Sequence, residues 1–541
     1  MELKENSSEK KLSGSYYTPQ RIAEIMTALS INDLQNGAYV LEPSCGDGVF
    51  IDALYAIRPD CFTTAIEIDG AESEKVQRKH KNQANLTIVT QDFFDFYEKN
   101  RKKIRYDLIV GNPPYIRYQY LTPEQRIAQA DILTSNSMKS NKLINAWVAF
   151  LVACVQLLND HGTISFVIPA EILQVAYAED LRSYLTERLS SITMITFKEL
   201  VFPYIEQEIL IFIGQKNSPE KGIRIVEVQD IEEFAALDLS HIRFQKITEK
   251  KGKWTQYFVS ADEMNLLYSV RNSNKFVPFS NYGLINVGIT TGNNKYFSID
   301  KNTEDKYRLT DVTMPLIGRS SHAHGIFFTY EDWKTNIAAG KRAMLVKFPE
   351  TPYEEYPDGH KEYIKYGEEN KEHTGYKCSI RDRWYIVPSV WIPDAFFLRR
   401  NNLYPKFVLN RCNAVSTDTM HRMKFYDDVD GENVLISYYN SISFAFSEIC
   451  GRSYGGGVLE ILPGEMGKIM LPKIIFVEPK LKSDILEFVD DVVRNNKDIE
   501  IALDYVDKHL LIEILGIPAE WCSACRTIWK KLQTRRLTRG E

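Results

Sequence analysis

The chain has 541 residues, of which 44% are apolar, and carries a formal net charge of −6. This length exceeds what one hydrophobic core can hold, so we expect at least two domains. The net charge argues against a nucleic-acid footprint over the whole surface, and no apolar run is long enough to cross a membrane. The first 14 residues are polar, unlike a signal peptide, and the eight cysteines are scattered, so we expect a cytoplasmic protein without a membrane partner.

The first part of the chain alternates short apolar stretches with helical ones. Strands are predicted within residues 38–50, 62–69, 86–94, 106–115 and 162–173, and helices within 70–82 and 145–162. This alternation predicts an α/β fold with a doubly wound, mostly parallel, Rossmann-like sheet. Ligands of such sheets bind at the carboxyl ends of the strands.

The character of the sequence changes near residues 217–250, which are charged and rich in turns. Irregular strand-like pieces with many aromatic residues follow, which is typical of a mixed α+β domain. Residues 352–377 are polar and tyrosine-rich and predict a loop or an exposed helix, whereas 484–516 have helical periodicity. The sequence thus predicts three parts, residues 1–245, 246–475 and 476–541.

The first predicted strand ends in Glu42, and Gly46 and Gly48 then bracket a turn into a helix. Glycines allow a backbone to approach a ligand closely, although many nucleotide-binding folds share this feature. The second strand ends in Glu67, an acid placed to pair with ribose hydroxyls. Asp92 follows the third strand and could accept a hydrogen bond from an adenine amine. No phosphate-binding lysine follows the glycines, so a nucleoside with a charged, non-phosphate tail fits best.

The fourth predicted strand ends in Asn112, Pro113, Pro114 and Tyr115. Two prolines cannot donate hydrogen bonds to a sheet, so the strand must stop there. The stiff turn that results presents bare carbonyl groups, an amide side chain and an aromatic ring. This set suits a flat ligand with an exocyclic amine.

The order of these motifs resembles that of the gamma-class, TaqI-type adenine-N6 DNA methyltransferases of restriction–modification systems. The matching motifs are "SYYTP" (15–19), "LEPSCGDGVF" (41–50), "AIEID" (65–69), "QDFF" (91–94) and "NPPY" (112–115). The likeness extends over about residues 14–215 and continues more weakly through "VGITTGNNKYF", "PLIGR" and "GRSYGGGVLEILPGE". It implies a methyltransferase sheet, a DNA target-recognition domain and C-terminal helices, with S-adenosyl-L-methionine as cofactor.

The resemblance also assigns roles to single residues. Those implied to bind the cofactor are Tyr17, Thr18, Glu42, Pro43, Ser44, Gly46, Gly48, Glu67, Ile68, Asp92, Phe93 and Asn112. The catalytic set would be Asn112, Pro113, Pro114 and Tyr115, with Tyr115 and either Phe202 or Phe212 stacking on a base flipped out of double-stranded DNA. Two acceptors, one on Asn112 and one on Pro113, would hold the N6 hydrogens, and developing positive charge would lie over Tyr115.

Other interpretations stay open. The same chemistry suits N4-cytosine methylation, and "NPPY" also occurs in enzymes that modify RNA or protein, although those chains are usually short. A bifunctional restriction–modification polypeptide or a non-catalytic DNA-binding subunit fits less well, because little sequence precedes "SYYTP" and both the glycine loop and "NPPY" are intact. Each motif also has a purely structural interpretation as an ordinary turn, strand end or helix cap.

The second half carries local basic excess. Residues 381–425 contain eight Lys or Arg against three Asp, and residues 526–539 contain six basic residues and no acid. We predict that Arg399, Arg400, Arg411 and Arg422 contact DNA, unless they pair with the chain's own acids. We expect a monomer without a metal site, since Cys522 and Cys525 lack two further ligands nearby, and a cognate restriction endonuclease as a functional partner.

Overall fold

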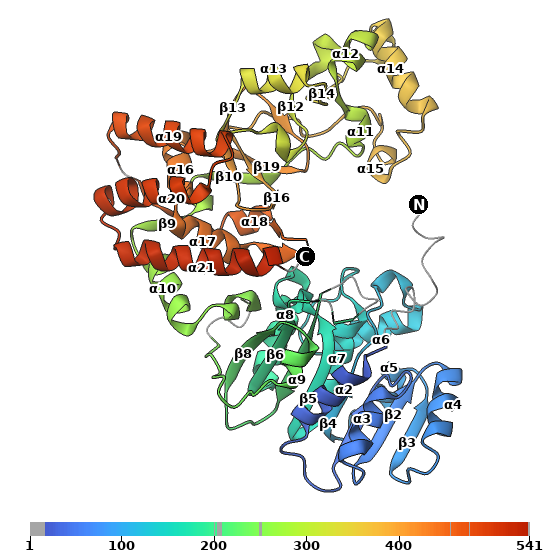
Figure 1. Cartoon of the computed structure of the whole chain (residues 1–541). Helices are drawn as coiled ribbons and strands as arrows, with labels where there is room; N and C mark the ends of the chain where they lie inside the picture. Colours follow the sequence, from blue (N-terminus) through green and yellow to red (C-terminus); the bar gives the residue numbers. More distant parts are fainter. Residues whose placement is uncertain are drawn as a thin grey trace. The chain divides into compact units, whose positions relative to one another are not determined.

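The computed structural model describes residues 17–199, 201–202, 208–247, 252–454, 456–474 and 476–538. The chain forms two compact units, Met1–Ala261 and Asp262–Glu541 (Figure 1). The domain boundary expected after residue 245 therefore falls within the first unit. The helices expected as a separate third part from residue 476 belong to the second unit.

The first unit is built on an eight-stranded sheet with the order β3-β2-β1-β4-β5-β7-β6-β8. The strands are β1 (Tyr39–Glu42), β2 (Phe62–Glu67), β3 (Leu86–Thr90), β4 (Tyr106–Gly111), β5 (Leu158–Pro169), β6 (Ser191–Phe197), β7 (Ile209–Gln215) and β8 (Gly222–Val228). Only β7 runs antiparallel to its neighbours, β5 and β6. The predicted doubly wound, mostly parallel α/β fold is confirmed.

Helices pack on this sheet in two groups (Figure 1). One group contains α2 (Gln20–Ser30), α3 (Val49–Ile57) and α9 (Ile231–Ala235), and the other α5 (Phe93–Asn100), α6 (Pro123–Thr134), α7 (Ala146–Leu157) and α8 (Glu179–Arg188). A further helix, α4 (Gly70–Lys79), packs on β2 and β3. The apolar sequence of α7 explains its position, because a helix that is apolar on all sides is stable only when buried.

The second unit contains several smaller sheets. Its five-stranded sheet has the order β10 (Gly283–Val287), β19 (Met420–Phe425), β15 (Ala395–Leu398), β17 (Phe407–Arg411) and β13 (Phe327–Thr329). The remaining strands are β9 (Phe276–Pro278), β11 (Ser298–Ile299), β12 (Thr313–Ile317), β14 (Met344–Val346), β16 (Arg400–Asn401), β18 (Val415–Ser416), β20 (Arg452–Tyr454), β21 (Val458–Glu460) and β22 (Met470–Pro472). This is the mixed architecture that the irregular strand pattern predicts.

The helices of the second unit range from one turn to five. They are α10 (Ala261–Asn272), α11 (Asn294–Phe297), α12 (Lys301–Tyr307), α13 (Tyr330–Ala338), α14 (Asp358–Glu369), α15 (Tyr376–Ser379), α16 (Gly431–Tyr438), α17 (Ser441–Cys450), α18 (Pro463–Met466), α19 (Pro479–Arg494), α20 (Ile499–Val506), a π-helical turn (Asp507–Ile514) and α21 (Ala519–Leu537). Among the described residues, no helix combines the length and the apolarity needed to cross a membrane.

The tyrosine-rich segment expected to be a loop or an exposed helix contains α14, which buries one face. Tyr363 and Ile364 of α14 are buried, and the Tyr363 ring stacks on Tyr296 with ring centroids 4.6 Å apart. Tyr363 also stacks on Tyr366, three residues later in α14, so the tyrosines of this segment contribute ring contacts although the residues between them are polar.

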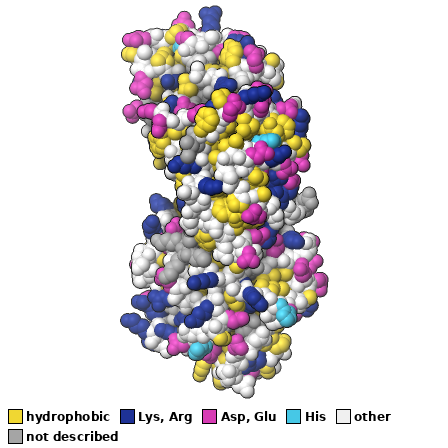
Figure 2. Space-filling view, turned by 90° about the vertical axis from the view of Figure 1, so that its left-hand side faces the viewer, with side chains coloured by type: hydrophobic (Ala, Val, Ile, Leu, Met, Phe, Trp, Pro, Cys, Tyr) yellow, Lys and Arg dark blue, Asp and Glu magenta, His cyan; other side chains and the backbone are white. Residues whose placement is uncertain are grey.

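Residues 526–537 of the basic C-terminal segment lie in α21, and several of their charges are paired within the second unit. Lys530 lies 2.6 Å from Glu500, and Arg536 lies 2.9 Å from Glu448 in a pair that is almost fully buried. On the face shown in Figure 2, basic and acidic side chains likewise alternate across the second unit, the upper part of that view. The segment is therefore a structural part of this unit.

Candidate active site

The glycine loop follows β1 and leads into α3. Glu42 is the last residue of β1, and the chain then turns through Gly46 at φ +51° and Gly48 at φ +80°. Both conformations are left-handed and favour glycine. The Cys45 amide donates a 2.8 Å hydrogen bond to the Ile66 carbonyl, so the loop is fixed beside the end of β2.

The carboxylate of Glu67 fixes both the glycine loop and the turn that follows β2. One oxygen accepts the Gly46 N–H at 2.8 Å, and the other accepts the Asp69 N–H at 2.8 Å. Each oxygen keeps a further lone pair for a ligand. Ile68 is 62% exposed and Tyr17 is 44% exposed, so apolar side chains stand beside this loop. The sequence identified the acid, but its bond to Gly46 is a contact that strand patterns do not reveal.

Glu42 carries a buried carboxyl group with an unused oxygen. Its side chain is only 2% exposed, and Oε2 has no hydrogen-bond partner among the described residues. Burial raises the pKa of Glu42 well above its usual range, and the nearby charges of Asp47 and Glu67 raise it further. An unpaired buried carboxyl is unfavourable by itself and is typical of ligand sites. A ligand that bears positive charge would compensate it.

Asp92 ends the connection from β3 and begins α5. One of its oxygens accepts the Phe94 N–H at 2.7 Å, and the other accepts a 2.8 Å hydrogen bond from the Gln125 side chain. Gln125 belongs to the capping box of α6, so Asp92 is tied to a second helix that the sequence did not connect with it. The neighbouring Phe93 ring is buried against Phe150 with centroids 4.6 Å apart, so its side chain belongs to the core.

The "NPPY" segment follows β4 beside the glycine loop. Asn112 donates a 3.2 Å hydrogen bond from its amide to the Thr18 hydroxyl, and the Ser44 hydroxyl donates to the Asn112 carbonyl at 3.2 Å. The Tyr115 hydroxyl donates to the Val167 carbonyl at 3.0 Å, which fixes the ring against β5. The tetrapeptide is thus held on both sides before any ligand arrives.

The strand order explains why these residues meet. The neighbours β3, β2, β1 and β4 are parallel, so their carboxyl ends form one edge of the sheet. This edge carries the predicted residues Tyr17, Thr18, Glu42, Pro43, Ser44, Gly46, Gly48, Glu67, Ile68, Asp92, Asn112, Pro113, Pro114 and Tyr115.

The two predicted base-stacking phenylalanines lie in the core. Phe212 in β7 is 0% exposed, and Phe202 is also buried. A ring with no exposed face has no surface on which a base could stack, so Phe212 is a core residue in this structure. Residues 203–207, which adjoin Phe202, lie outside the described part of the chain.

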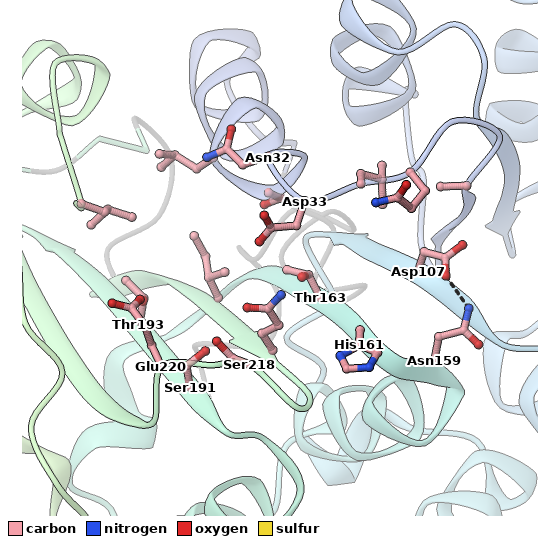
Figure 3. Close-up of a pocket in the computed structure, with 18 of the residues that line it drawn as sticks. Asn32, Asp33, Asp107, Asn159, His161, Thr163, Ser191, Thr193, Ser218 and Glu220 are labelled. Atoms are coloured by element: carbon pink, nitrogen blue, oxygen red, sulfur yellow. Dashed lines mark hydrogen bonds between the residues drawn. The ribbon is translucent and has the colours of Figure 1, made fainter.

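A large hollow of about 1130 Å³ lies at the opposite edge of the same sheet (Figure 3). Its lining includes Tyr39 at the start of β1, Asp107 near the start of β4, and Asn159 and His161 near the start of β5. None of the residues predicted for the site lines this hollow. It is therefore distinct from the edge that holds the glycine loop, despite its size.

Three of the four arginines predicted to contact DNA pair with carboxylates of the second unit. Arg399 and Arg400 lie 3.0 and 3.5 Å from Glu460, and Arg411 pairs with Glu432. A carboxylate partner competes with a phosphate for the same guanidinium, so these three are weakened candidates. No cluster of three or more metal-ligating side chains occurs among the described residues.

Comparison with known proteins connects this geometry to a family. The family model described as Eco57I restriction-modification methylase matches residues 22–202, and the model of the type II methyltransferase M.Eco57I C-terminal domain matches residues 251–511. The chain belongs to the Eco57I-type restriction–modification methylases. The first match contains the glycine loop, the acids Glu42, Glu67 and Asp92, and the "NPPY" segment of this methylase.

Relatives of this methylase are similar over different lengths. Type II methyltransferase M.AccI of Acinetobacter calcoaceticus is 23% identical over 520 residues, which cover 93% of each chain. Type II methyltransferase M.HincII of Haemophilus influenzae is 28% identical over 238 residues, 43% of each chain. The solved structure of the type IIL restriction-modification enzyme MmeI has a TM-score of 0.57 at 13% identity, over 98% of this chain and 80% of that one, which shows a shared fold. The cofactor of the methylase is S-adenosyl-L-methionine.

Proposed function

We propose that this methylase transfers a methyl group to the N6 amine of an adenine flipped out of double-stranded DNA, and so protects that DNA from a cognate restriction endonuclease. The observation that carries the proposal is the "NPPY" segment, which Ser44 ties to the glycine loop and Thr18 ties to the segment before α2. The related structure of MmeI supports a DNA substrate, because it is a complex with DNA.

The residues at the sheet edge fit S-adenosyl-L-methionine, which supplies a methyl group on a positively charged sulfur when bound. Glu42 offers a buried oxygen that has no partner among the residues the structure describes, which suits the positive methionine end of the ligand. Glu67 and Asp92 suit the ribose hydroxyls and the adenine amine. The exposed side chains of Tyr17 and Ile68 suit the apolar faces of the nucleoside.

The "NPPY" residues would activate the target amine by position and charge. The Asn112 amide nitrogen is held by Thr18, so the orientation of the amide oxygen is fixed as an acceptor. That oxygen and the Pro113 carbonyl would each accept one N6 hydrogen, which leaves the nitrogen lone pair free to attack. Positive charge that develops on the amine would be stabilised by the face of the Tyr115 ring. No base is needed before transfer, and the surplus proton leaves to water afterwards.

Modification-sensitive sequencing of DNA from a methylation-free host that expresses this chain tests the proposal. We expect N6-methyladenine at one short sequence, and none in cells that express Asn112→Ala. N4-methylcytosine at one sequence would support the alternative base. Unmodified host DNA, with modified RNA or protein, would contradict a DNA substrate.

Replacement of Glu67 by alanine should weaken cofactor binding at least tenfold. Its carboxylate holds Gly46 and Asp69 by charged hydrogen bonds, each worth about 1.5–3 kcal/mol. Isothermal calorimetry measures the affinity, and thermal unfolding checks the fold. Glu74→Ala, which removes an exposed acid from nearby α4, should leave the affinity unchanged. Equal affinities for wild type and Glu67→Ala would remove Glu67 from the site.

Replacement of Glu42 by glutamine should raise the thermal midpoint of the cofactor-free protein while weakening cofactor binding. Because burial raises the folded-state pKa, folding favours protonated Glu42, and this contribution is lost as pH rises from the unfolded value of 4.5 through the folded value. A neutral amide removes that loss, so the midpoint difference should grow with pH over this range. Each kcal/mol corresponds to about 2–4 °C.

The matched control for this comparison is Glu98→Gln, which changes an exposed acid of the same unit. Its midpoint should follow that of the wild type at every pH in scanning calorimetry. A Glu42→Gln midpoint that stays equal to, or below, the wild-type midpoint at neutral pH would show that the Glu42 carboxyl is not a destabilising group.

A further inference from the structure

Arg422 of β19 is a buried arginine that has no carboxylate partner in the described part of the chain. Its side chain lies between β10 and the loop before β15, and the residue is only 5% exposed. Nε donates to the Val287 carbonyl at 3.0 Å, and Nη1 donates to the Ser389 carbonyl at 2.8 Å. Within the described part of the chain, Nη2 has no hydrogen-bond partner and no Asp or Glu oxygen lies within 4.0 Å of the guanidinium.

The surrounding loop holds this guanidinium in one orientation. The Trp391 ring stacks on it, with the guanidinium carbon 4.4 Å from the ring centroid. Ser389, which supplies one of the carbonyl acceptors, has φ +57°, a left-handed conformation that is unfavourable for residues other than glycine. The Trp391 ring and the two carbonyl acceptors therefore fix the guanidinium, and its Nη2 donors are not used in these contacts.

A hollow of about 380 Å³ opens at this guanidinium. Leu284, Asn286, Ser389, Trp391, Arg422 and Lys424 line it, and we call it the Trp391–Arg422 hollow. Lys424 is exposed at its margin and pairs with Asp394 at 2.7 Å. The side chains that line the hollow include two cations and no acid.

No carboxylate among the described residues compensates the charge of Arg422. Burial lowers the pKa of its guanidinium, and no neighbouring acid opposes this effect. Arginine nevertheless stays protonated, so the chain holds a partly desolvated positive charge. Arg536, the comparable buried arginine of this unit, lies 2.9 Å from Glu448. A buried charge without a partner is unfavourable, and an anion in the hollow would compensate it.

We propose that the Trp391–Arg422 hollow binds one phosphate group of the DNA backbone. This inference rests on the proposed function, since it takes DNA as the substrate. Base edges lie inside the grooves of DNA and are read by side chains that protrude, whereas phosphates project outward and fit into a recess. A recessed, pre-oriented guanidinium therefore positions the duplex without reading its sequence. The contact predicted for Arg422 is thereby assigned to the backbone.

The test compares wild type with Arg422→Gln in binding to a mixed-sequence duplex over a range of salt concentrations. Loss of one phosphate contact should reduce the slope of log affinity against log salt by about one. The affinity should fall by the same factor for the mixed-sequence duplex and for a duplex that contains the sequence the enzyme methylates. Lys334→Gln is the matched control, because Lys334 also lies over a ring, that of Tyr330, but pairs with Glu331. Its slope should equal that of the wild type.

Two results would overturn the proposal. An unchanged slope for Arg422→Gln would show that no phosphate binds there. A loss confined to the target sequence, with relaxed methylation at one position, would show base reading instead. The underlying function fails in another way, namely if wild-type protein leaves no N6-methyladenine in DNA, whatever the salt slope.

A second measurement tests the proposal without the Arg422→Gln variant, in case that variant does not fold. Because Trp391 stacks on the guanidinium, an anion in the hollow should change its fluorescence. Addition of the mixed-sequence duplex should therefore change the emission of wild type more than that of Trp391→Phe. Identical responses of the two proteins would contradict occupation of the hollow by DNA.

Discussion

Asn112→Ala should lower the single-turnover rate of methyl transfer by about 10²–10³-fold while the cofactor affinity stays close to that of the wild type. The amide oxygen acts on an amine whose positive charge develops only in the transition state, and one such group contributes about 2.7–4 kcal/mol. The rate is measured with saturating DNA and cofactor, and the affinity by calorimetry. An equal loss in both would instead assign Asn112 to cofactor binding.

Two comparisons separate this role from a structural one. Asn112→Asp keeps an acceptor oxygen at the same place, so it should retain more activity than the alanine variant. Asn100→Ala, at the end of α5, removes an amide that donates to the Phe96 carbonyl one turn earlier, and should leave the rate unchanged. Near-normal turnover by Asn112→Ala would be incompatible with the proposed activation of the amine.

The sheet edge of the first unit could be predicted because its signals are local. Each strand is a short apolar run, and the residue that ends it, such as Glu42 or Glu67, lies at a position that parallel topology brings to one edge. The cross-links between these ends could not be predicted. Gln125 reaches Asp92 from 33 residues away, and nothing in either local pattern indicates that contact.

The role of Phe212 could not be predicted for a different reason. The run "EILIFIG" predicts a strand, and β7 spans Ile209–Gln215. However, β7 lies between β5 and β6 with both faces covered, so its residues do not alternate between core and solvent. A ring in such a strand is buried whichever way it points, and the sequence cannot distinguish this from a ring in a ligand site.

Several basic residues of the second unit pair with acids that lie far away in the sequence, and composition alone does not reveal these pairs. Arg399 meets Glu460 from 61 residues away, and Arg536 meets Glu448 from 88 residues away. Both appear in the sequence as members of basic segments. Arg422, in contrast, keeps its charge uncompensated among the described residues, so the same basic excess contains both structural and candidate DNA-binding arginines.

Glu448→Gln should destabilise the second unit by roughly 3–5 kcal/mol, because it leaves the buried Arg536 charge without a counter-charge. Glu448 on α17 and Arg536 on α21 are each at most 3% exposed in their side chains, and Nε of Arg536 contacts both carboxylate oxygens at 3.1 Å. Hydrogen exchange of peptides from α17 and α21 should accelerate accordingly, while exchange in the first unit stays unchanged.

Removal of both charges of the Glu448–Arg536 pair should have the opposite effect to removal of one. Replacement of both partners, Glu448→Leu with Arg536→Met, removes the two buried charges together and should restore much of the lost protection. Asp491→Asn on α19, which breaks the exposed pair with Lys497, should leave exchange in α17 and α21 as in the wild type. If Glu448→Gln exchanged like the wild type, or if the double variant were less protected than the single one, the pair would not anchor α21 by charge compensation.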